Sequence, residues 1–417
     1  MTNKPPNPIH TLSPFPFLNP TTRYHPITPT PSTTDEKREP IPDEHHHPPT
    51  HPVQDHGIYH VWRSRDNRKG RHAALVRRRK SGEQEKGRVA ATFPRTTNSF
   101  AATVKGVVKM VTRFPVWDVS YDVAVVFTLG SIVWVINAFF VWLPLAAPST
   151  EFPGETDIAG GWTAFIGATI FEFGSVLLMI EAVNENQTDC FGWALSSALE
   201  SSPHLHPTKE SCRHHHYNRK SWLSRTPHPS SSPTHPLLES SVSTPLKQPD
   251  RSLRKWTWLP TPTELRTHYL RELGFLACLA QFLGATVFWI AGFTGIPQVS
   301  AALRSTAAQN GAYWTPQVVG GVGFVVSGVL FMVEVQERWY KPAPSLLGWH
   351  VGFWNLVGAV GFTLCGALGF GVDGGRSVEY ALTMATFVGS WAFLIGSIFQ
   401  WYESLDKYPV LVGDVPF

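Results

Sequence analysis

The chain has 417 residues, a formal net charge of +4 and 43% hydrophobic residues, together with 35 prolines and 18 histidines. Its apolar residues are gathered in six segments, whereas residues 1–115 and 196–262 are rich in Pro, Ser, Thr, His and basic side chains. This division excludes an ordinary soluble globular domain and indicates a membrane protein with long polar segments.

Residues 1–116 are predicted to form a disordered cytosolic tail, because they contain too few apolar side chains for a core. They run through PPNP, PTPTPS and EPIPDEHHHPPTHP to the basic cluster Arg77–Lys80. Three roles are open for this cluster: contact with anionic lipid headgroups, a receptor-read address, or a solvated tail that only enforces orientation. After it, KGVVKMVTRF predicts a short basic amphipathic helix at the membrane interface.

Six segments are long enough to cross a bilayer, for which about 20 mostly apolar residues suffice. None of them contains Lys or Arg. We therefore predict an all-α polytopic membrane protein with six transmembrane helices. The predicted spans are Val123–Leu145, Ala159–Ala182, Leu273–Phe293, Thr315–Val335, Leu347–Phe370 and Val378–Tyr402.

The loop charges predict the orientation of these spans. The loop 146–158 has no Lys or Arg, and the loops 294–314 and 371–377 have one Arg each. All the other Lys and Arg residues fall on the opposite side of the bilayer. Since basic loops stay in the cytosol, both termini are predicted to be cytosolic, in the plasma membrane or an endomembrane.

The second, fourth and sixth spans share a pattern that predicts three tandem two-helix repeats. In the first unit it consists of Gly167, Phe171, Gly174 and Glu181, which the helical spacing places on one face. The matching sets are Gly320, Phe324, Ser327 and Glu334, and Gly389, Phe393, Gly396 and Glu403. The odd spans repeat a glycine and an aromatic residue: Gly130 and Trp134, Gly284 and Phe288, Gly358 and Phe362.

These repeats set the predicted domain boundaries. The three hairpin units are residues 117–195, 263–340 and 341–417. Residues 196–262 are a His-, Ser- and Pro-rich segment, predicted to be a disordered cytosolic insertion into the regular plan. An incorrectly spliced gene model is the other origin left open for that segment.

The paired helices with their Gly-Ser motifs resemble the YrhK-type two-helix membrane module. The whole core resembles uncharacterised multi-span integral membrane proteins of filamentous fungi. The resemblance covers residues 117–417 apart from the insertion. It implies a helical membrane fold and no assigned activity, so it supplies no catalytic residue.

The repeated carboxylates Glu181, Glu334 and Glu403 are predicted to be interfacial anchors. Each stands at the cytosolic end of its span, within reach of interfacial water and of cations such as Arg338 or Lys407. A functional role for the three carboxylates is the alternative.

Glu172 does not repeat, because Val325 and Leu394 occupy its matching positions. A charge near mid-membrane costs roughly 2.5–3.5 kcal/mol on insertion scales, so this residue has to face the bundle, be protonated or find polar partners. Gln281 and Asn355 stand at a similar depth. Two hypotheses follow: a proton- or cation-coupled polar site made of these three residues, or a neutral, hydrogen-bonded Glu172 that fixes helix register.

Cys212, His214, His215 and His216 form a weak metal-binding candidate, since no paired Cys spacing accompanies them. We expect no resident metal or other cofactor and no enzymatic activity. The favoured function is membrane organisation or partner binding, and the alternative is a small-solute or proton-coupled ion transporter using Glu172. The lipid bilayer is the expected partner, nucleic acid is not, and homo-oligomerisation is left open.

Overall fold

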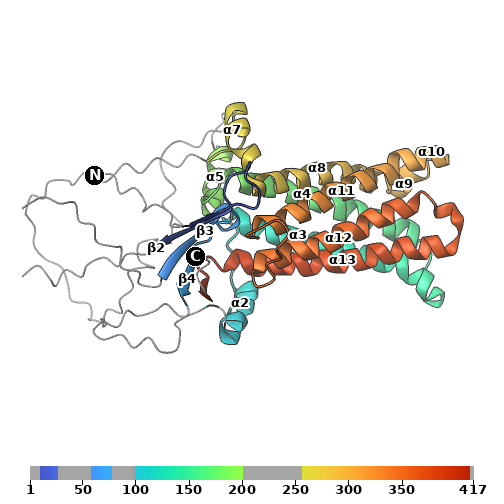
Figure 1. Ribbon diagram of the computed structural model, residues 1–417. Helices are drawn as coiled ribbons and strands as arrows, with labels where there is room; N and C mark the ends of the chain where they lie inside the picture. The colour runs from blue at the N-terminus through green and yellow to red at the C-terminus, as the bar shows by residue number, and fades with distance from the viewer. Residues whose placement is uncertain (1–9, 27–57, 78–96, 98, 201–255, 414–417) are drawn as a thin grey trace, which may run out of the picture.

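The computed structural model describes residues 10–26, 58–77, 97, 99–200 and 256–413. Six long helices run side by side through most of it (Figure 1). Each is long and apolar enough to cross a membrane, which confirms the predicted polytopic all-α fold and is compatible with an integral membrane protein. The helices are α3 (Val119–Ala146), α4 (Gly161–Val183), α8 (Leu273–Thr294), α11 (Thr315–Glu334), α12 (Leu347–Gly369) and α13 (Arg376–Leu405).

The six helices form a closed ring. Each packs against the helix before it and the helix after it in this order, and α13 packs back against α3. Glycines allow the closest approach: a Cβ on Gly284 of α8 would lie 2.9 Å from the carbonyl oxygen of Gly320 in α11. Small residues let helix backbones touch, which favours association where lipid removes the hydrophobic drive.

An aromatic layer fills the axis of the ring with one buried side chain from each helix. Trp134, Phe288 and Phe362 from the odd spans pack together, with the Trp134 ring centroid 4.8 Å from that of Phe362 and 5.7 Å from that of Phe288. Phe393 packs 5.5 Å from Phe171 on the even spans. These helices are not neighbours in the ring, so the contacts cross its axis. The layer comprises Trp134, Phe171, Phe288, Phe324, Phe362 and Phe393.

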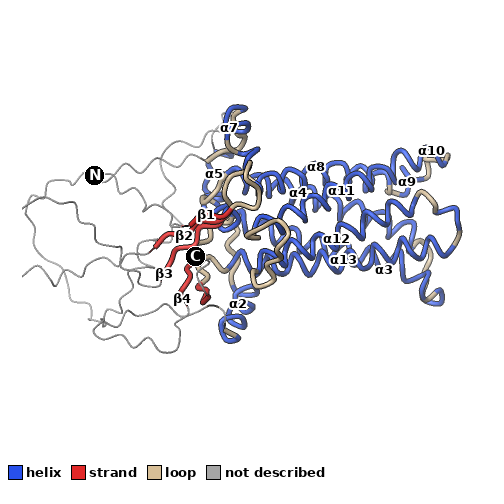
Figure 2. Tube along the Cα trace, in the orientation of Figure 1, coloured by secondary structure: helices blue, strands red, loops and turns tan. Residues whose placement is uncertain are grey.

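A five-stranded sheet lies at one end of the ring, which we call the sheet end (Figure 2). Strands β1 to β4 pair antiparallel in chain order, and β5 pairs parallel to β4. Their bounds are β1 His10–Leu12, β2 Thr22–Pro26, β3 Ile58–Arg63, β4 Ala73–Arg77 and β5 Val410–Gly413. The beginning and the end of the described chain thus meet in one sheet.

This sheet differs from the disordered tail predicted for residues 1–116. Tyr24, Tyr59, Val61 and Leu75 form a small core of their own. Short alternating strands such as IYHVWR supply it, and the surrounding Pro-rich composition conceals them. The described part of the predicted insertion also differs, since Trp256 is buried against the helix ring.

The remaining helices are short, apart from α2, and lie at the two ends of the ring (Figure 1). The α-helical ones are α1 (Ser64–Arg68), α2 (Phe100–Thr112), α5 (Phe191–Glu200), α7 (Pro262–Thr267), α9 (Pro297–Ser300) and α10 (Thr306–Gln309). The 3-10 and π turns are η1 (Pro148–Thr150), η2 (Glu155–Gly160), η3 (Thr188–Cys190), η4 (Tyr269–Arg271), η5 (Asn310–Trp314) and η6 (Val372–Gly374).

Candidate functional site: a buried ion-pair network

The connection between β3 and β4 carries the positive charges that meet the helix ring. It reads SRDNRKGR and folds into the short helix α1 followed by a tight turn at Gly70, whose φ of +61° is a conformation that favours glycine. A Cβ on Gly70 would also lie 2.8 Å from the Thr188 hydroxyl. The turn brings together four basic side chains, none more than 8% exposed: Arg65, Arg68, Lys69 and Arg71.

The three repeated carboxylates meet this segment from the other side. Glu181, Glu334 and Glu403 stand near the sheet end of α4, α11 and α13, and none is more than 1% exposed. Each of them lies within 4 Å of a basic side chain of this segment. The structure therefore differs from the predicted interfacial anchors: these carboxylates are enclosed by protein, away from water.

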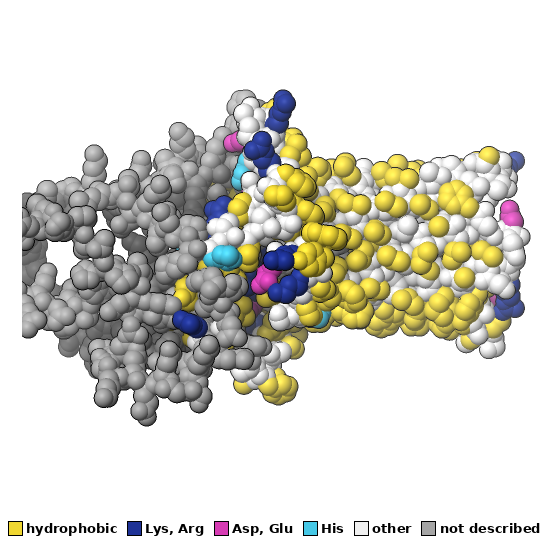
Figure 3. All heavy atoms as spheres, viewed as in Figure 1, with side chains coloured by type: hydrophobic (Ala, Val, Ile, Leu, Met, Phe, Trp, Pro, Cys, Tyr) yellow, Lys and Arg dark blue, Asp and Glu magenta, His cyan; other side chains and the backbone are white. Residues whose placement is uncertain are grey.

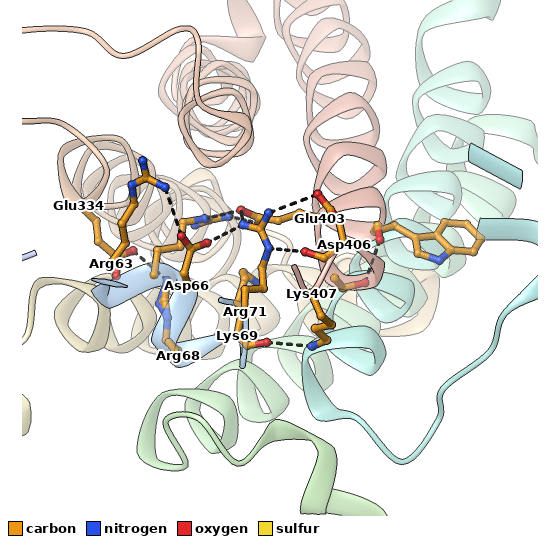
Figure 4. Close-up of polar contacts among 12 residues, drawn as sticks. Arg63, Asp66, Arg68, Lys69, Arg71, Glu334, Glu403, Asp406 and Lys407 are labelled. Carbon is orange, nitrogen blue, oxygen red and sulfur yellow. Dashed lines mark hydrogen bonds and ion pairs between the residues drawn. The ribbon is translucent and has the colours of Figure 1, made fainter. Parts of the chain in front are cut away.

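Arginine holds two of the carboxylates directly (Figure 4). Arg65 donates from Nη2 to Glu403 Oε2 at 2.7 Å and from Nε to Oε1 at 3.0 Å, a bidentate pair. Arg68 donates from Nη2 to Glu334 Oε2 at 2.8 Å, and Ser64 Oγ donates to the other oxygen at 3.1 Å. Such charge-assisted hydrogen bonds are stronger than neutral ones.

Arg71 joins the network to its own segment. Its Nη1 atom lies 2.6 Å from Asp66 Oδ1 and 3.1 Å from Glu403 Oε1. Burial alone would lower the pKa of Arg65, but the adjacent Glu403 carboxylate outweighs it and raises that pKa above its ordinary value. The arginines therefore remain charged in this enclosed place.

Glu181 is held more loosely than its two repeat partners. Lys69 Nζ lies 3.4 Å from its Oε1 atom and Arg68 Nε lies 4.0 Å away, and neither contact meets hydrogen-bond geometry. Burial lowers the pKa of Lys69, partly opposed by Glu181. The network is thus asymmetric, with two tight arginine pairs and one loose lysine pair.

A small cavity lies between the network and the aromatic layer. Its volume is about 30 Å³, which is enough for one or two water molecules. Arg65, Arg68 and Lys69 line one side, and Phe171 and Phe393 line another. Its uncharged polar lining comprises Ser131, Gln281, Asn355, Ser397 and Gln400.

The predicted polar site at mid-membrane is only partly brought together. Gln281 and Asn355 line the same cavity. Glu172 is not among the described side chains that line it; instead it accepts a hydrogen bond of 3.0 Å from Thr286, a residue exposed on the outer surface of α8. The three candidates therefore do not form one site in this conformation.

The cations named for the repeated carboxylates have other partners. Lys407 pairs with Asp118 at 2.6 Å and donates to the Lys69 carbonyl oxygen at 2.8 Å. Arg338 is exposed and donates to the Tyr340 hydroxyl at 2.7 Å. Sequence reasoning missed the actual partners, α1 and the turn after it. The available signal was the basic run SRDNRKGR between two alternating apolar segments.

The weak metal candidates Cys212, His214, His215 and His216 lie outside the described residues. Within the described ranges, no group of three or more His, Cys, Asp or Glu side chains is arranged to hold a metal ion.

Comparison with known proteins adds no relative: no family model, no curated protein and no solved structure matches this chain. The resemblance to YrhK-type modules therefore stays a prediction, and function has to be argued from the site.

Glu185 links the end of α4 to α1, and its burial makes the stability of this region pH-dependent. Asn67 Nδ2 donates to its Oε2 atom at 2.7 Å. Burial, with a smaller contribution from nearby Glu272, raises the Glu185 pKa to about 7. The Asn67 hydrogen bond favours the ionised carboxylate, but burial outweighs it. A folded-state pKa above the ordinary value means that ionisation of Glu185 destabilises the fold, so its contribution to stability is fully present below about pH 4.5 and is lost as the pH rises through about 7.

Glu185→Gln is therefore expected to resist unfolding about as well as the parent near pH 5 and better near pH 8. Thermal unfolding of both proteins in the same detergent across this range measures the difference, and other titrating groups cancel between them. A constant offset between the two profiles would contradict the expectation.

Proposed function

We propose that this protein is a non-enzymatic integral membrane protein whose helix ring is a closed platform for the sheet, organising partners at one face of the membrane. The observation that carries the proposal is the closure of the ring axis at two successive levels. The aromatic layer occupies the middle of the axis, and the ion-pair network occupies the sheet end. A structure filled in this way suits a scaffold better than a conduit.

The network also supports the platform role because it joins distant parts of the chain. Arg65 and Glu403 are 338 residues apart in sequence and form a bidentate pair. β4 and β5 pair beside them. Buried pairs of this kind are costly to break by loss of one partner. The sheet is thereby fixed to the ring rather than tethered by one strand.

Orientation is part of the same proposal. Among the described residues, most Lys and Arg side chains lie at the sheet end, and the opposite loops carry only Arg304 and Arg376. By the positive-inside rule the sheet, with both chain termini, faces the cytosol. The likeness of the helix pairs to YrhK-type modules, proposed from sequence, agrees with a membrane role without assigning chemistry.

The alternative function, proton- or cation-coupled transport through Glu172, is tested by flux. Full-length protein in sealed vesicles is expected to pass protons, K⁺ and Na⁺ no faster than protein-free vesicles, with an added ionophore as the positive control. The position of Glu172 at the outer face between α4 and α8 supports this expectation. Flux in the parent protein that Glu172→Gln abolishes would instead favour the transporter.

A further inference from the structure

Helix α2 exposes apolar side chains beside the sheet end. It begins after Ser99, whose hydroxyl accepts a hydrogen bond from the Ala102 amide at 3.3 Å. Several of its large apolar side chains are exposed, Phe100 by 86% and Val111 by 69%. The exposed set is Phe100, Val104, Val107, Val108 and Val111. A contiguous apolar surface of this kind marks an interaction site.

The helix has three distinct sides. At about 100° per residue, the exposed apolar side chains form one stripe and the pair Gly106 and Met110 forms a second, about 120° away. The second stripe packs on protein: Met110 is buried, and a Cβ at Gly106 would overlap the ring of Tyr402 in α13. Lys105 and Lys109 form the third side, about 140° from the apolar stripe.

The position of α2 connects its apolar stripe to the outer surface of the ring. The helix projects sideways from the ring at the sheet end (Figure 1). The chain then passes through the exposed residues Phe114, Val116 and Trp117 directly into α3, the first candidate span. Apolar side chains cover the flank of the ring up to this level (Figure 3). The stripe therefore continues the surface that lipid would cover.

We propose that α2 docks on the anionic headgroup layer of the bilayer around the ring. Val104, Val108 and Val111 enter the boundary of the acyl chains, while Lys105 and Lys109 contact acidic phospholipid headgroups. An apolar stripe on one side of a helix and basic residues on another is the pattern of helices that lie in the membrane interface. The proposal depends on the membrane embedding of the ring but goes beyond it, since an embedded ring does not require α2 to touch lipid.

The test attaches an environment-sensitive fluorophore to Val108→Cys in a protein that also carries Cys212→Ser. The Cys212→Ser protein without Val108→Cys is the blank, because it reports any labelling of the buried cysteines Cys190, Cys278 and Cys365. The full chain is placed in phosphatidylcholine vesicles with and without phosphatidylserine. We expect lipids brominated on their acyl chains to quench the label on Val108→Cys more than a label on Lys105→Cys. A label on Phe173→Cys, an exposed position on α4, reports separately whether the ring itself is embedded.

The anionic preference is measured with brominated phosphatidylserine against brominated phosphatidylcholine. Each lysine near an anionic surface is expected to strengthen binding about fivefold, so brominated phosphatidylserine should quench the label on Val108→Cys more than brominated phosphatidylcholine does. Lys105→Gln/Lys109→Gln is expected to remove this preference, whereas Lys341→Gln, an exposed lysine already paired with Glu337, is expected to retain it.

Three results would overturn the proposal while the Phe173→Cys label still reports an embedded ring. The label on Val108→Cys is quenched by aqueous iodide as strongly as the one on Lys105→Cys. In the second result, the label on Val108→Cys is shielded from both iodide and brominated lipid until the protein is diluted. That result would mean that a second copy of the chain covers α2. The double lysine variant keeps the full preference for phosphatidylserine.

Discussion

Replacing Glu403 with Gln is expected to lower the free energy of unfolding by about 3–5 kcal/mol, because Arg65 would keep a buried charge without its counter-ion and Arg71 would keep only its aspartate partners. The amide keeps the size of the side chain, so the loss reports the missing charge. Denaturant unfolding in detergent micelles measures the change. Hydrogen exchange at β3 and β4 should increase at the same time, because this pair holds the sheet to the ring.

Glu337→Gln is the matched control for this substitution. Glu337 is 44% exposed and pairs with Lys341 on the surface at 2.7 Å. Exposed pairs of this kind contribute about 0.5 kcal/mol or less. Equal stability of the two variants would mean that the buried network does not hold the sheet to the ring.

Phe362→Ala is expected to cost about 3–5 kcal/mol, the range for removing a large aromatic side chain from a packed core. Phe362 is 2% exposed and contacts Trp134 and Phe288 across the axis of the ring and Phe393 on the neighbouring helix. The ion-pair network has no part in these contacts, so hydrogen exchange in β3 and β4 should change less than in Glu403→Gln. Unfolding in micelles again gives the measurement.

Phe173→Ala removes the same chemistry from the outer surface of α4, where the side chain is 57% exposed. We expect a change below about 1 kcal/mol for this control, because surface substitutions away from packed features have small effects. Comparable losses for both phenylalanines would show that the aromatic layer is not the core of the ring.

The helices were the most predictable part of this protein. Their length and the absence of Lys and Arg define them, and only the ends differ from prediction. The first span starts at Val119 rather than Val123, because the Asp118 side chain accepts a hydrogen bond from the Ser120 amide and caps it. The last span continues to Leu405, past the predicted end at Tyr402.

Helical spacing also predicted side chains that share one face of a helix. Phe171 and Phe393, matched by sequence position alone, meet in one layer. Position along a helix gives depth, but depth does not give rotation about the helix axis. For that reason Glu172 was grouped with Gln281 and Asn355, whereas it points toward Thr286.

The basic run SRDNRKGR is visible in the sequence, but its pairing with the repeated carboxylates is not. Glu334 and its partner Arg68 are 266 residues apart. The basic residues stand in a region whose average composition is rich in Pro, Ser and His, and that average hid the two short strands that present them. Pairing of this kind depends on the tertiary arrangement, which composition and periodicity do not encode.

The parallel pairing of β4 with β5 has a consequence for how the chain is made. Residues Ala73–Arg77 are synthesised long before their neighbours Val410–Gly413. Glu403, the tightest partner of Arg65, is also supplied by the final helix. Completion of the sheet therefore has to follow synthesis of α13, and in a chain that lacks α13 and β5 Arg65 would have lost its bidentate partner while β4 would have one unpaired edge.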